Sequence, residues 1–188
     1  YSAFCALSHA LTDKIPAKDI SALIFSGQMQ DVIPVGSNLQ SLGNAILYSD
    51  GRAGAQAEVI ENAVGGDTIT AITGNHFDGS MPLAKILWLK ENEPEIYTQT
   101  TAFLISSKDY VVAKLTRNFI GDMTACATAG AMDLEYKTWS QCLINGAGLD
   151  INKFPKLLHS HELAGIITET GAADTGYLPG TKVYAGTG

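Results

Sequence analysis

Apolar residues near the start of the chain recur at the spacings that mark helices and strands. Phe4, Leu7 and Leu11 follow one another at helical intervals, so residues 1–14 are predicted to form an amphipathic helix that ends before Pro16. Three short apolar runs between turn-forming residues come next, at 20–25, 32–35 and 45–48. Runs of this length are typical of strands, and we expect these three to be neighbours in one sheet.

Helical periodicity returns further along the chain and alternates with short apolar runs. The pattern predicts helices at 53–62, 68–73, 83–92, 108–115, 139–145 and 168–175, and strands at 103–105 and 183–185. Ser106 or Ser107 is placed to cap the helix that begins at Lys108. The segment 74–80 is rich in turn formers and is predicted to be a loop of the kind that carries function. Helices that alternate with strands indicate an α/β domain.

Composition and charge exclude several classes of protein. Hydrophobic residues make up 46% and charged residues 16% of the 188 positions, which is typical of a packed globular domain and not of a disordered chain. No run of about 20 apolar residues is present, so a membrane span is not expected. The 12 Lys and Arg against 19 Asp and Glu are scattered and give a net charge of −7. Without a basic stripe, nucleic acid is not an expected partner.

The cysteines indicate the cellular compartment of the protein, and the two ends of the sequence indicate whether it is part of a longer chain. Cys5, Cys126 and Cys142 are odd in number and far apart, so neither a disulfide framework nor a zinc site is predicted, and a reducing cytoplasmic location is expected. The sequence begins at Tyr1 and ends just after a predicted strand. We therefore expect it to be part of a longer chain.

Single chemical side chains give only weak indications. His159 and His161 stand two apart without a third ligand in view, so we interpret them as surface residues. Asp109 and Asp122 are open to two interpretations, as catalytic carboxylates or as residues that cap helices and form turns. No GxGxxG, GxxxxGK[ST] or GxSxG pattern is present.

A set of segments in a fixed order carries more information. Residues 80–92, SMPLAKILWLKEN, contain Pro82, then Lys85 and Trp88 at spacings that resemble the first signature of the FGGY carbohydrate kinases. The SGQMQ of 26–30 resembles the family's sugar-contacting SGQMH turn, and the AILYSDGR of 45–52 resembles its AILWxDxR segment. Further resemblances to KDYVxxxLT, DxTNASxTxLxD and LxxGTPVxxGxGD lie at 108–116, 122–133 and 178–188. The pentulose branch, which contains xylulose kinases and their relatives, is the most similar.

The resemblance implies a fold and an activity. The expected fold is a ribonuclease-H-like (actin-like ATPase) α/β domain with a mixed sheet flanked by helices, and residues 1–188 would be most of the N-terminal sugar-binding domain. The parent enzyme would use ATP and Mg²⁺ to phosphorylate a small sugar, a ketopentose such as D-xylulose. An N-terminal phosphate hairpin and a C-terminal ATP domain would lie outside this chain. A homodimer is left open.

The resemblance also assigns residues. Gln28, Met29 and Gln30 would bind the sugar, together with Asp50 and Arg52. The alternatives are a turn residue for Gln28, a core methionine for Met29 and a surface ion pair for Asp50 and Arg52. The catalytic aspartate is expected directly after Gly188, so no catalytic residue, cofactor-binding residue or metal ligand is assigned within the chain. Lys85 is predicted to be partly exposed at the rim of the cleft, and Trp88 to lie in the core.

Departures from the family pattern support an alternative function. Gln30 replaces the histidine of SGQMH and offers a sugar only an uncharged amide. Ala125 and Ala127 replace an asparagine and a serine, and Arg117 replaces a glycine, so altered turn geometry is expected there. Gln30, Ala125 and Ala127 are compatible with a non-catalytic sugar-binding or regulatory protein of the same fold. An aspartate directly after Gly188 would favour the kinase.

Overall fold

The structure, a computed structural model, describes residues 1–186. Its α-helices are α1 (Ser2–Thr12), α2 (Gly54–Val64), α3 (Gly66–Thr73), α4 (Pro82–Asn92), α5 (Pro94–Gln99), α6 (Ser107–Thr116), α7 (Met123–Cys126), α8 (Gln141–Gly146) and α9 (Glu169–Thr175). Short 3₁₀ turns are η1 (Ala17–Asp19), η2 (Ala127–Ala129) and η3 (Ile151–Lys153). The strands are β1 (Ala22–Leu23), β2 (Ile33–Val35), β3 (Ala102–Leu104), β4 (Ile120–Asp122), β5 (Met132–Asp133), β6 (Thr138–Trp139), β7 (Lys156–Leu158), β8 (Leu163–Ile166) and β9 (Lys182–Tyr184).

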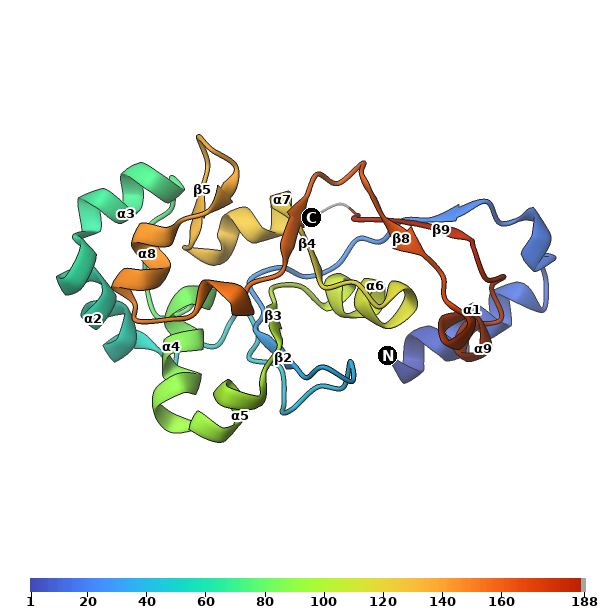
Figure 1. Cartoon of the computed structure of the whole chain (residues 1–188), viewed down its shortest axis with the longest axis horizontal. Helices are drawn as coiled ribbons and strands as arrows, with labels where there is room; N and C mark the ends of the chain where they lie inside the picture. Colours follow the sequence, from blue (N-terminus) through green and yellow to red (C-terminus); the bar gives the residue numbers. More distant parts are fainter. Residues whose placement is uncertain (187–188) are drawn as a thin grey trace.

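One end of the elongated molecule is built on a three-stranded mixed sheet (Figure 1). In this sheet β1 runs parallel to β9 with Leu23 opposite Val183, and β8 pairs with β9 in the antiparallel sense. Val183, Leu115 and Ile167 are fully or almost fully buried in the core beside it. Helices α1 and α9 lie side by side at this end.

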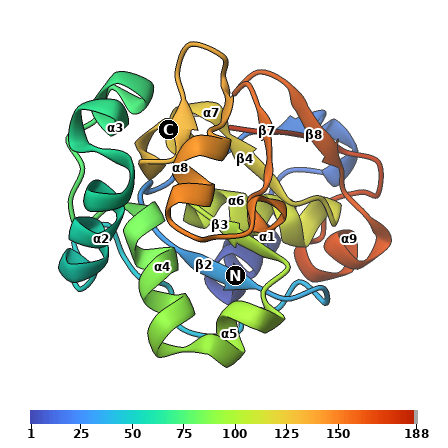
Figure 2. The ribbon, with the colours of Figure 1, turned by 60° about the vertical axis from the view of Figure 1, so that its left-hand side comes forward.

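The other end is mostly helical and holds the larger core. Helices α2, α3, α4 and α8 surround it (Figures 1 and 2), and Ile60, Ile69, Ile86 and Leu143 are completely buried there. The antiparallel pair β2 and β3 and helix α6 lie between the two ends, where Val35 and Leu104 form a third, smaller core. The turns that join these parts are the ones that carry the candidate site.

The helices follow the sequence pattern more closely than the strands do. Ser106 is the N-cap of α6 and accepts a hydrogen bond from the Lys108 N–H, as predicted. The prediction of three neighbouring strands in one sheet is wrong: β1 pairs with β9, and β2 pairs with β3. The run 45–48 contributes only an isolated bridge from Ile46 to Val32. Strand pairing depends on distant parts of the chain, which a local pattern does not contain.

Helix α1 packs by a different face from the one that its apolar residues predict. Phe4 lies edge-on to Phe25, with ring centroids 5.5 Å apart, and Ser8 is the buried residue of the helix. Leu7 is 73% exposed and Leu11 41% exposed, so the prediction that both face the core is wrong. Helix α1 contacts α9, and Leu7 lies on its exposed side. Between residues 1 and 186, no helix has both the length and the apolar character needed to cross a bilayer.

Candidate functional site

The turn 27–31 follows β1 and rests on the junction of β3 and α6. The Asp31 N–H donates to the Ile105 carbonyl at 3.0 Å, and the Ser106 hydroxyl donates to the Gln28 carbonyl at 2.6 Å. A Cβ at Gly27 would lie 3.1 Å from the Cβ of Lys108, so the turn approaches α6 more closely than most side chains allow. Hydrogen bonds through its main chain therefore fix the candidate sugar-contacting turn against β3 and α6.

Gln30 is held in a strained conformation at the end of this turn. Its φ of 63° lies in the left-handed region, where residues other than glycine are uncommon. Its Nε2 donates to the Thr128 carbonyl at 3.4 Å and lies 3.8 Å from the Met81 sulfur. The amide nitrogen of Gln30 is therefore already bonded within the protein. The amide oxygen is then the group with which Gln30 can accept a hydrogen bond from a ligand.

Lys85 is buried, and the prediction that it is partly exposed at the cleft rim is wrong. Its side chain has no exposed surface, and its Nζ donates to the Gln30 carbonyl at 3.1 Å and the Leu47 carbonyl at 2.7 Å. Burial lowers the pKa of this lysine. Because the turns 27–31 and 47–52 both cover the first part of α4, the side chain that was expected at a rim becomes the link between them.

Asp31 is a second buried group that the sequence analysis missed. It is 2% exposed, accepts a hydrogen bond from Gln28 Nε2 at 2.8 Å and faces the main-chain N–H of Tyr48. Burial raises the pKa of Asp31, and the nearby Lys85 ammonium opposes that change. A carboxylate directly before the wholly buried run 32–35 was the available signal, since a charge in such a place needs partners.

Asp50 and Arg52 form an ion pair at the edge of the same region. Arg52 Nη2 lies 2.6 Å from Asp50 Oδ2, and Arg52 Nε lies 3.1 Å from Oδ1. Hydrogen bonds from Arg52 lower the pKa of the Asp50 carboxyl. The Arg52 guanidinium also stacks 4.8 Å from the centre of the Trp88 ring. Trp88 is half-buried against the main core, so its predicted place inside that core is only partly correct.

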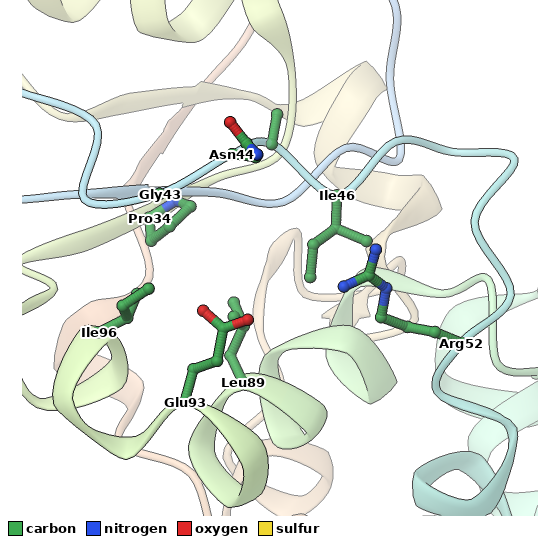
Figure 3. A pocket seen from close by; sticks show the side chains of 9 residues that line it. Pro34, Gly43, Asn44, Ile46, Arg52, Leu89, Glu93 and Ile96 are labelled. Carbon is green, nitrogen blue, oxygen red and sulfur yellow. The ribbon is translucent and has the colours of Figure 1, made fainter.

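A small cavity lies behind this ion pair, towards the far end of α4. It has a volume of about 190 Å³, and Leu89, Ile46 and Ile96 line its apolar part. Figure 3 shows the side chains of Arg52 and Glu93 on two different sides of it. The cavity therefore connects to the candidate site through Arg52.

A buried group of charges, here called the α6 charge cluster, consists of Lys108, Asp109 and Asp122. Lys108 Nζ lies 3.0 Å from Asp109 Oδ1 and 3.3 Å from Asp122 Oδ2, and all three side chains are at most 1% exposed. Burial raises the pKa of Asp109 to about 7. Asp122 caps α7 by accepting from the Thr124 and Ala125 N–H groups, which confirms the capping interpretation of that residue.

The two histidines fall outside the turns 27–31 and 47–52 and the α6 charge cluster, whereas Met29 lies in the turn 27–31 itself. His159 and His161 lie near the surface with their rings 5.6 Å apart. Met29 is half-buried beside Gln28 and Gln30. Gly188, after which the catalytic aspartate is expected, lies outside the described residues.

The replaced residues keep regular local structure. Arg117 ends α6 with φ 62° and ψ 17°, the left-handed conformation that glycine favours. Ala125 is buried in α7, and the Ala127 carbonyl accepts a hydrogen bond from Asn75 Nδ2 at 2.8 Å. This bond ties the loop 74–80 to η2, whose Thr128 also holds Gln30.

Together these contacts define a mixed α/β domain in which Lys85 clamps two turns that carry polar side chains. A sequence model of the FGGY family of carbohydrate kinases, N-terminal domain, matches residues 2–188. The chain belongs to this family.

Individual relatives agree with that assignment. The chain is 36% identical to a xylulose kinase of Bacillus subtilis over 172 residues, which is 92% of this chain and 34% of that protein. Among solved structures, a xylulose kinase from Rhodospirillum rubrum has a TM-score of 0.89 at 25% identity. The match covers 98% of this chain and 38% of the Rhodospirillum chain. A gluconate kinase from Lactobacillus acidophilus has a TM-score of 0.84 at 28% identity, with 96% and 36% covered.

These similarities establish the ribonuclease-H-like, actin-like fold class that the motifs implied. The chain spans about a third of the length of the curated relatives that it matches.

Proposed function

We propose that the whole protein containing this chain transfers the γ-phosphate of ATP to a hydroxyl of a small sugar, a ketopentose such as D-xylulose. Family membership supports the sugar kinase class, and the xylulose kinase relatives support the ketopentose. In this proposal residues 1–188 are most of the N-terminal sugar-binding domain, and the reaction takes place in the cytoplasm, where ATP is available.

The observation that carries the proposal is the Lys85 clamp. Lys85 bonds one carbonyl in each of the turns 27–31 and 47–52, and these turns carry Gln28, Met29 and Gln30, and Asp50 and Arg52. Fixed turns with hydrogen-bonding side chains suit a substrate whose recognition depends on several hydroxyl groups. Because Arg52 is already paired with Asp50, the site offers mainly uncharged partners, as a neutral sugar requires.

The chemistry needs groups beyond those described here. A general base must take the hydroxyl proton, and Asp109 and Asp122 are unsuited to this because both are buried in ion pairs. The proposed base is the aspartate expected directly after Gly188. Within residues 1–186 no group of three His, Cys, Asp or Glu side chains that could hold a metal ion is found. When bound, Mg²⁺ would neutralise the phosphate charge of ATP.

The test is a coupled assay on the whole protein with ATP and, in turn, D-xylulose, gluconate and glycerol. The expected result is sugar-dependent ADP formation with the highest kcat/KM for D-xylulose. A higher kcat/KM for gluconate would contradict the ketopentose but keep the kinase. Sugar binding without ADP formation would favour the non-catalytic alternative. Sedimentation of the same sample distinguishes a monomer from the homodimer that the family resemblance leaves open.

A further inference from the structure

The α6 charge cluster of Lys108, Asp109 and Asp122 contacts the candidate sugar-binding turn from one side. A Cβ on Gly27 would lie 3.1 Å from the Lys108 Cβ, and one on Gly186 would lie 3.4 Å from the Lys108 Cδ. The aliphatic stem of Lys108 therefore packs between the turn after β1 and the turn after β9. A shift of this stem would therefore move the surface of α6 against which the turn 27–31 packs.

The cluster reaches the same turn from the other side through Asp122. This residue ends β4 and caps α7, and η2 follows α7 directly. Thr128 in η2 accepts the hydrogen bond from Gln30 Nε2. The ion pair between Lys108 and Asp122 thus sets the separation of the two elements that hold the sugar-binding turn, α6 and the α7–η2 segment.

We propose that the α6 charge cluster is a positioning device for the sugar-binding turn, and that protonation of Asp109 loosens it. The inference rests on the proposed function in so far as it speaks of sugar. Lys108 and Asp109 are positioning residues in this role, because they act through the turn and not on the substrate itself.

The charges of the cluster explain why protonation matters. One ammonium faces two carboxylates, so the cluster carries one unbalanced negative charge when both are ionised. Asp109 Oδ2 has no hydrogen-bond partner within residues 1–186, whereas Asp122 Oδ1 accepts one from the Ser160 hydroxyl. Among the described residues 1–186, the buried Cys126 thiol also faces the cluster, and burial raises its pKa well above the ordinary cysteine value. Asp109 is therefore the member of the cluster that takes up a proton near neutral pH, where burial places its pKa of about 7.

Ionisation of Asp109 has opposite consequences for stability and for binding. Because its pKa is raised by folding, its contribution to stability is largest below the ordinary aspartate pKa and is lost as the pH rises through about 7. Lys108 lies between both carboxylates, and its attraction to Asp109 is strongest when that carboxyl is ionised. We therefore expect the affinity for sugar to fall as the pH is lowered from about 8 to about 6, although the contribution of Asp109 to stability grows over the same range.

The main experiment compares the whole protein with its Asp109→Asn variant. At about pH 8 the variant is expected to melt at a higher temperature, yet to show a sugar KM raised by about 2- to 30-fold with the KM for ATP unchanged. Its sugar KM is also expected to lose the dependence on pH between about 6 and 8. Glu169→Gln, which neutralises an exposed carboxylate in the first turn of α9, is the matched control and is expected to behave like the wild type. A purely structural role would move stability and affinity in the same direction, and that result would overturn the proposal.

A second measurement does not depend on sugar or activity. In the whole protein labelled with ¹³C-serine and ¹⁵N-glycine, which selects glycines that follow serine, the amide resonance of Gly27 is expected to shift with a midpoint near pH 7. The shift is expected to be absent in Asp109→Asn. A Gly27 resonance that does not titrate would overturn the positioning device, whatever the assay shows. A titrating resonance in a protein that phosphorylates no sugar would overturn the proposed function alone.

Discussion

At the scale of single residues, Lys85 shows how two carbonyl groups can replace the water around a buried ammonium. The variant Lys85→Met keeps the length of the stem but leaves the Gln30 and Leu47 carbonyls without their donor. We expect a loss of about 1–3 kcal/mol in the free energy of unfolding, since buried polar groups would remain unpaired. We also expect a raised KM for sugar, because the two turns are no longer tied together. Urea denaturation and steady-state kinetics measure these effects, with the exposed Lys14→Met as control. Equal behaviour of the two variants would contradict the clamp.

Gln30 is the residue on which sugar recognition can be tested most directly. Gln30→Ala removes the amide oxygen that is proposed to accept a hydrogen bond from the sugar. The variant is expected to lose about 0.5–1.5 kcal/mol of transition-state stabilisation, which lowers kcat/KM for the sugar. The KM for ATP is expected to stay nearly constant. If both substrates lose equally, the variant has a folding defect and Gln30 does not contact the sugar.

Arg117 stores backbone strain at the end of α6. Its left-handed φ of 62° disfavours any residue with a Cβ, so Arg117→Gly is expected to stabilise the fold by about 0.5–1 kcal/mol, although glycine adds freedom to the unfolded chain. Arg117→Ala keeps the strain and serves as control, with no gain expected. The urea midpoint of each variant gives the comparison. A gain in the alanine variant equal to that in the glycine variant would show that the arginine side chain, and not the backbone, causes the cost.

At the scale of elements, helix α4 separates a completely buried residue from a half-buried one. Ile86 has no exposed surface, so Ile86→Ala is expected to cost about 2–5 kcal/mol through the cavity that it leaves. Trp88 is half-buried and stacks with Arg52, so Trp88→Ala is expected to cost less, about 1–3 kcal/mol. Urea denaturation of both variants decides the order. A larger loss for Trp88→Ala would mean that its ring is more deeply packed than the structure shows.

The helices of this chain can be predicted from sequence more fully than its strand pairings. The bounds of α2, α3, α4 and α6 follow from apolar periodicity, glycines and Ser106, all of which lie within one helix length. The pairing of β1 with β9 joins residues 22 and 182, and no local pattern contains that information.

The candidate site was predictable in part for the same reason. The ion pair of Asp50 and Arg52 was predictable because the partners are two residues apart. The clamp by Lys85 was not, because burial of a lysine depends on segments that reach it from 38 and 55 residues away. Asp31 lies buried beside the same clamp. Motif resemblance located the turns, but only the fold shows what holds them.

At the scale of the whole molecule, the chain places its polar turns between the two larger of its three cores. The larger core is formed mainly by α2, α3, α4 and α8, and the smaller one lies beside the sheet of β1, β9 and β8 (Figure 1). The turn 27–31 leaves the sheet and meets α4 through Lys85 and α6 through Lys108. The site therefore depends on both parts of the molecule being folded together.

Residues 1–188 on their own are expected to be inactive as a sugar kinase. Residues 1–188 supply the clamped turns but only about a third of the length of the curated relatives, and Asp109 and Asp122 are too deeply buried to serve as the base. We therefore expect no sugar-dependent ADP formation when these 188 residues are produced alone, because positioning the sugar without the phosphate donor and the base leaves the barrier unchanged. The coupled assay is run on the purified 188-residue chain and on the whole protein side by side, after circular dichroism has shown that the shorter chain is folded. The whole protein with Gln30→Ala is the control, since it keeps every residue outside this chain and loses the proposed sugar contact together with the bond to Thr128. Turnover by the folded 188-residue chain well above the blank would show that it already holds the base and the phosphate-binding groups, and would contradict the assignment of these groups to residues outside it.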